Sequence, residues 1–100
     1  MSNNYVAGGG LIVALGATTV EQTGMLPGWL YEFTTMGGHA LMRWGASDAS
    51  AADAGFDFAV SPGGVVRAVC PTNITAINII EADAQSVATA QVAIARLYPI

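Results

Sequence analysis

The residue types that most often carry out chemistry in proteins are scarce in this sequence. His39 is the single histidine and Cys70 the single cysteine, so they cannot form a zinc ligand set of three or four residues or an internal disulfide. His39 follows the glycine pair at 37–38, which favours a turn or surface position over a general base. Cys70 ends an apolar run just before Pro71, which predicts a buried, unreactive thiol. We therefore expect no enzyme activity and no catalytic residues.

Acidic and glycine-rich segments give no stronger signal for a metal or a cofactor. Asp48, Asp53 and Asp57 cluster in one expected loop, but they lack the alternating ligands and final Glu of an EF-hand, so we favour a solvated acidic loop over a calcium site. The glycines at 8–10 could suggest a phosphate cradle, yet the chain has no lysine to complete a P-loop. We expect no metal and no cofactor.

Charge is unusually low for a soluble domain. Charged residues make up 10% of the 100 residues and the net charge is −4, whereas an average soluble domain has about 25% charged residues. Three arginines and no lysine are too few to build a basic surface for nucleic acid or anionic lipid, so we expect neither as a partner. The shortage of charge instead predicts a surface covered by other subunits, with a small homo-oligomer such as a trimer as one form.

The elements that must position these residues are predicted to be strands. Gly and Pro interrupt the sequence at short intervals, and the runs between them are rich in Val, Ile, Thr and aromatic residues. This pattern predicts an all-β fold, a small antiparallel β-sandwich or barrel of about seven to eight short strands. Residues 11–100 are expected to form the single domain, and residues 1–10 a flexible N-terminal arm. Strands are expected near residues 11–15, 18–22, 29–35, 40–44, 56–60, 65–69, 76–81 and 91–97.

The segment 81–97 leaves two alternatives open. Val87, Ala90, Ile94 and Leu97 recur at helical spacing, which favours a helix. β-branched residues and an alternation of larger and smaller side chains from Val92 onward favour a strand. We expect a strand at the end of this segment.

Aromatic and arginine residues are the candidates for contact with a partner. Trp29, Tyr31 and Phe33 alternate along one strand face, which is typical of core, with a contact stripe as the alternative. Arg43 and Arg67 lie within apolar strands, so each is expected to form a salt bridge within the subunit or across an interface. The candidate interface comprises Tyr5, Trp29, Tyr31, Arg43, Trp44 and Arg67.

From residue 39 onward the layout resembles small β-sandwich proteins of tailed-phage virions. The shared features are an A-L-x-R-x-G strand (residues 40–45), a polar loop, an apolar strand (56–60), a Pro-Gly turn with a short strand (61–67), and an Ile-rich strand after Thr75. The resemblance covers about 60% of the chain, and its motifs are mostly those of β-hairpins in general. The first 38 residues match no pattern of this kind.

The resemblance implies a structural role in a virion. We expect a capsid decoration (cement) protein that binds the phage head, with the major capsid protein or other virion subunits as partners. Such a protein would be made in the host cytoplasm and located in the virion. A tail, baseplate or head–tail joining subunit is the alternative within this class. A carbohydrate- or receptor-binding β-sandwich, with Trp29, Tyr31 or Trp44 stacking on a sugar ring, is the alternative from another class.

Overall fold

Short alternating segments separated by turns fold this chain into eight strands. The computed structural model describes residues 5–16, 19–45, 55–82 and 90–99. The strands are β1 (Tyr5–Ala14), β2 (Val20–Thr23), β3 (Leu30–Met36), β4 (Ala40–Trp44), β5 (Phe58–Val60), β6 (Val65–Val69), β7 (Ala76–Glu81) and β8 (Gln91–Pro99). The all-β prediction is confirmed, and the end of the segment 81–97 is a strand. Asp48 and Asp53 of the expected acidic loop lie outside the described residues.

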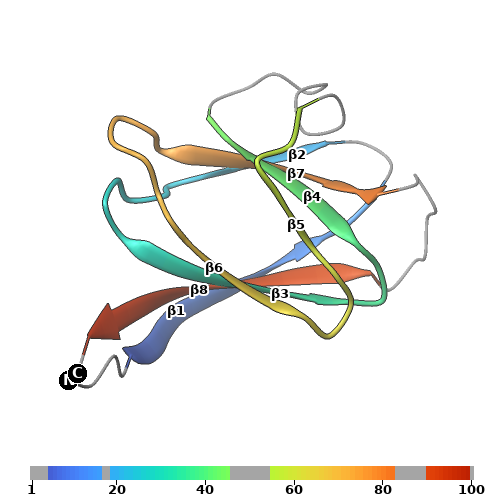
Figure 1. The fold of residues 1–100 in the computed structure, drawn as a ribbon, viewed down its shortest axis with the longest axis horizontal. Coiled ribbons are helices and arrows are strands. Elements are labelled where there is room, and N and C mark those ends of the chain that lie inside the picture. The colour runs from blue at the N-terminus through green and yellow to red at the C-terminus, as the bar shows by residue number, and fades with distance from the viewer. Residues whose placement is uncertain (1–4, 17–18, 46–54, 83–89, 100) are drawn as a thin grey trace.

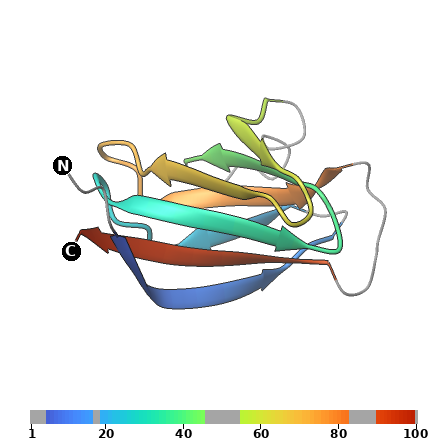
Figure 2. The ribbon, with the colours of Figure 1, turned by 60° about the horizontal axis from the view of Figure 1, so that its bottom comes forward.

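The strands form two four-stranded antiparallel sheets that pack face to face (Figure 1 and Figure 2). Sheet A has the order β1-β8-β3-β6 and sheet B the order β2-β7-β4-β5. The chain passes from one sheet to the other at every step except β4 to β5. This strand order is that of the jelly roll, a double-sheet sandwich of two Greek keys. The prediction of a sandwich or barrel is therefore confirmed as a sandwich.

The first strand begins earlier than its sequence pattern indicates. β1 starts at Tyr5 rather than Leu11, and its first half pairs with the end of β8, from Tyr5 opposite Pro99 to Gly8 opposite Arg96. The expected arm is therefore corrected for residues 5–10, which belong to sheet A, while residues 1–4 lie outside the described residues. The reason is that β8 extends to Pro99 and so provides a pairing partner for the first residues of β1. A register shift follows between Gly8 and Leu11.

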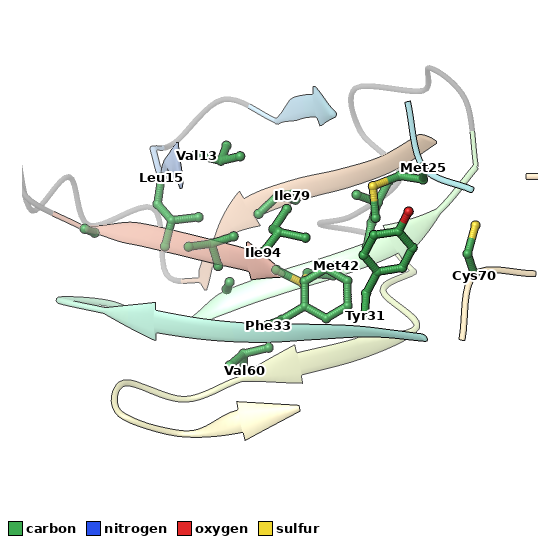
Figure 3. Close-up of a cluster of buried hydrophobic side chains, with 14 residues drawn as sticks. Val13, Leu15, Met25, Tyr31, Phe33, Met42, Val60, Cys70, Ile79 and Ile94 are labelled. Carbon is green, nitrogen blue, oxygen red and sulfur yellow. The ribbon is translucent and has the colours of Figure 1, made fainter. Parts of the chain in front are cut away.

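The hydrophobic core lies between the sheets and is made by inward-facing residues of both (Figure 3). Phe33 of sheet A and Met42 and Ile79 of sheet B are at most 1% exposed. Phe33 lies 5.2 Å from Phe58 and 6.0 Å from Trp44, measured between ring centroids, so an aromatic cluster joins β3 to β4 and β5. Aromatic pairs at this spacing add to the stability that burial of apolar area supplies.

The turns follow the chemistry that the sequence predicts. Gly37 and Gly63 have positive φ angles of 80° and 74° in the connections β3–β4 and β5–β6, a conformation that costs glycine little. Thr35 is buried at the second of these turns, where its hydroxyl donates to the Ser61 carbonyl over 2.8 Å. This hydrogen bond holds the β5–β6 turn against β3. The turn connects sheet B, through β5, to sheet A, through β6.

Candidate functional site

The residues whose side chains could carry out chemistry lie apart from one another. His39 is exposed next to the β3–β4 turn, as expected. Cys70 is fully buried, and its thiol donates to the Ile74 carbonyl over 3.2 Å. Burial raises the pKa of this thiol, which keeps it in the unreactive protonated form. Asp57 accepts a hydrogen bond from the Trp44 amide at 2.9 Å, and no group of three or more His, Cys, Asp or Glu in the described residues could hold a metal ion.

The aromatic members of the candidate interface divide between core and surface. Tyr31 is 5% exposed and Trp44 packs against the core, so both serve the interior of the sandwich. Trp29 comes just before β3, is 37% exposed, and contacts Tyr98 rather than the core. The backbone of Tyr5 opens β1, while its side chain lies outside the described part of the structure. The aromatic row therefore forms no continuous stripe.

The two arginines lie on different sheets. Arg67 on β6 forms the expected ion pair, with its Nε 3.0 Å from Oε2 of Glu32 on β3. Arg43 on β4 of sheet B is exposed, and no ion pair to it is found among the described residues. The five candidates whose side chains the structure describes thus do not converge on one site, and geometry selects other residues.

Sheet A presents an apolar outer face. Directly paired residues of antiparallel strands share a face, so the register defines rows that run across the sheet, such as Val65, Thr34, Ala93 and Ile12. Four of the five most exposed large hydrophobic side chains in the described residues lie on this face, namely Ile12 at 63%, Val69 at 57%, Val65 at 56% and Met36 at 48%. The outer face is formed by Ile12, Ala14, Leu30, Glu32, Thr34, Met36, Val65, Arg67, Val69, Gln91, Ala93 and Ala95.

Among the described residues of the outer face, charge is confined to one pair. Glu32 and Arg67 lie opposite each other in the same row and neutralise each other. Small side chains fill the centre of the face, where Ala93 and Ala95 of β8 lie beside β3. A surface with small central residues, exposed apolar edges and no net charge among its described side chains is well suited to packing against another protein surface.

A second feature is a partly open cavity at one end of the sandwich. Its volume is about 120 Å³, and its apolar walls are Leu11, Met25 and Ile94. Tyr31 and Arg96, which lie opposite each other on β3 and β8, supply polar groups to the wall together with Thr23, and Gly24 completes the lining. The sequence did not single out Arg96, although its position in the alternating β8 between Ala95 and Leu97 gives the same signal as Arg43 and Arg67.

Comparisons of this chain with protein-family models, with curated proteins and with solved structures find no match. Across the residues that the structure describes, no helix has the length and apolar character needed to cross a membrane.

Proposed function

We propose that this chain is a structural subunit of a tailed-phage virion, most specifically a capsid decoration protein, and that it assembles through the outer face of sheet A. The observation that carries the proposal is the exposure of Ile12, Met36, Val65 and Val69 on one nearly charge-free sheet face. Monomeric proteins rarely expose large continuous apolar patches, and such patches mark interaction sites.

Covering the apolar side chains of this face would contribute to association. Burying a whole Val, Ile or Met side chain contributes about 1.5–3 kcal/mol, and each of the four is about half exposed. Covering them together would contribute roughly 3–6 kcal/mol before the entropic cost of association. Because association itself costs about 4–15 kcal/mol, one such contact is marginal alone, and several contacts acting together are needed for stable binding.

The size of the face favours an assembly with several contacts per subunit. β3 has seven residues, which gives a length of about 24 Å, and four strands give a width of about 19 Å. The resulting flat area of about 450 Å² is below the ~800 Å² that each partner contributes to a standard interface. A subunit in a shell or ring meets several neighbours, so a decoration protein fits this limit better than an isolated dimer.

The fold and the composition give support of a general kind. Jelly rolls occur in viral capsid proteins and in lectins, although fold alone does not determine function. A charge content of 10% is compatible with a surface that is largely covered in its working state. A tail, baseplate or head–tail joining subunit would share these properties, and the number of copies in each virion separates it from a decoration protein.

Assembly is tested by light scattering after size exclusion at protein concentrations from about 1 μM to 1 mM. We expect the wild type to associate as the concentration rises, and Ile12→Glu and Val69→Glu to stay monomeric. Phe56→Glu is the matched control, because Phe56 is 50% exposed but lies outside sheet A. Binding to phage capsids that lack their decoration protein then tests the virion role. A wild type that stays monomeric and does not bind such capsids would refute the proposal.

One observation favours the second candidate, a carbohydrate-binding sandwich. Trp29 is the exposed member of the three aromatic residues considered for stacking on a sugar, and it lies 5.2 Å from Tyr98. A glycan array with the wild type and Trp29→Ala tests this candidate. Binding that Trp29→Ala abolishes would favour it, whereas a silent array would count against it.

A further inference from the structure

Arg96 is a partly buried cation that has no acidic partner in the described part of the chain. It lies on the inner side of sheet A, where its neighbours in the row are Gly8 and Tyr31. Its guanidinium forms no ion pair with any carboxylate of the described residues. Arginines at partly buried positions normally pair with a carboxylate or phosphate, because their fork of N–H groups matches those anions. A ligand that carries such an anion could therefore pair with Arg96.

The guanidinium of Arg96 is held in place by aromatic contacts. Its Nε donates to the Tyr98 hydroxyl over 2.7 Å, and its central carbon lies 4.9 Å from the ring centre of Trp29 and 5.0 Å from that of Tyr98. Tyr98 in turn packs over Gly8, where an added Cβ would lie 3.0 Å from the ring. A cation fixed in this way loses little side-chain entropy when it binds an anion.

The cavity beside Arg96 has a shape and polarity that limit its ligand. A volume of about 120 Å³ equals that of roughly four water molecules at ~30 Å³ each, close to the five heavy atoms of a propionate group. Leu11, Met25 and Ile94 give it an apolar wall. The Tyr31 hydroxyl accepts from the Leu26 amide over 2.9 Å, so its own proton is left to donate to a ligand.

We infer that this cavity binds a carboxylate on a short aliphatic stem, with Arg96 pairing the carboxylate, Tyr31 donating a hydrogen bond, and the apolar wall covering the stem. A single arginine balances the one charge of a carboxylate but only part of the charge of a phosphate. The same chemistry can come from a free short-chain acid or from a Glu side chain of a partner protein. The inference does not depend on the outer face, which lies on the opposite side of sheet A.

The test is a ¹H–¹⁵N NMR titration of the wild-type protein at pH 7 with propionate, and with propionamide as its neutral counterpart of equal size. Saturable shifts of the Arg96 Nε–H signal and of the Met25 amide are expected with propionate at millimolar affinity, and are not expected with propionamide. Acetyl-Glu-amide forms the second arm. Tighter binding of propionate indicates a free acid, and tighter binding of the Glu derivative indicates a partner's side chain.

Variants assign the binding to the guanidinium. Arg96→Gln is expected to weaken propionate binding at least about tenfold, and Arg96→Lys to weaken it less, because lysine keeps the charge but loses the fork. Arg43→Gln is the matched control, since it removes an exposed arginine of the other sheet and should leave binding unchanged. Equal binding of propionate and propionamide, tighter binding of inorganic phosphate, or no saturation of the wild type below about 100 mM would each overturn the inference. The comparison of propionate with propionamide on the wild-type protein still tests the inference if an Arg96 variant fails to fold.

Discussion

Glu81 offers a sharp test of how the interior of the sandwich is stabilised. It ends β7 opposite Ala40 on the inner face of sheet B, is 4% exposed, and its buried Oε2 accepts no hydrogen bond from the described residues. Leaving such an acceptor without a donor costs about 1–3 kcal/mol, and more when the group is charged. We therefore expect Glu81→Met, which keeps the length of the side chain without its polar atoms, to raise the free energy of unfolding by about 1–3 kcal/mol.

Glu81→Gln removes the charge but keeps a polar group, so it should give a smaller increase of about 1 kcal/mol. Urea unfolding followed by tryptophan fluorescence measures both variants. With a slope of about 1–3 kcal/mol per molar urea for a protein of this size, an increase of 2 kcal/mol moves the midpoint by about 1 M. Asp57→Ala is the contrasting control, because the Asp57 carboxylate accepts from the Trp44 amide at 2.9 Å. That variant should lose about 1 kcal/mol. If Glu81→Met lowers the midpoint instead, the carboxylate stabilises the fold and the reasoning is refuted.

Three further predictions concern the core, a buried thiol and a turn. Phe33→Ala should lower the free energy of unfolding by about 3–5 kcal/mol in urea, because Phe33 is fully buried at the centre of the aromatic cluster, and a loss below about 1 kcal/mol would contradict that placement. Because burial raises the pKa of Cys70, the native thiol keeps its proton above the usual cysteine pKa of about 8.5 while the unfolded thiol loses it. Stability should therefore fall as the pH rises through this range, by at most about 1.4 kcal/mol per pH unit, and comparison with Cys70→Ala isolates this component. Gly63→Ala should cost about 1 kcal/mol through its φ of 74° alone, since no atom lies within 4 Å of the added Cβ, and Gly16→Ala at a site without positive φ is its control.

Most of the strands could be predicted because their alternation and their turn residues act locally. β4, β6 and β7 agree with expectation at both ends, since Gly or Pro flanks β4 and β6 and an Ile-rich run marks β7. The start of β1 could not be predicted, because three successive glycines carry no side chains and therefore no alternation. Pairing with β8, more than eighty residues away, makes that segment a strand.

The candidate sites were harder to predict because exposure depends on register between distant strands. Tyr31 and Trp29 share one alternation, yet the first is core and the second is exposed beyond the end of the sandwich core. Val65 and Val69 read as ordinary strand residues, and only their pairing with β3 shows that they face outward. Arg96 lies in the segment where helix and strand remained alternatives, so its side of the sheet could not be assigned.

The position of β8 has a consequence for how the protein folds. β8 is the last of the eight strands along the chain, yet it lies between β1 and β3 in sheet A. Until it docks, β1 has no partner in its sheet, and the β3–β6 pair has an unpaired edge along β3. Closing pairs as distant as Tyr5 and Pro99 is slow, and open edges in an unfinished sheet favour pairing with other chains. During synthesis, the period of greatest aggregation risk should thus extend until β8 becomes available, and substitutions that weaken β8 should reduce soluble yield more than equally destabilising substitutions in β5.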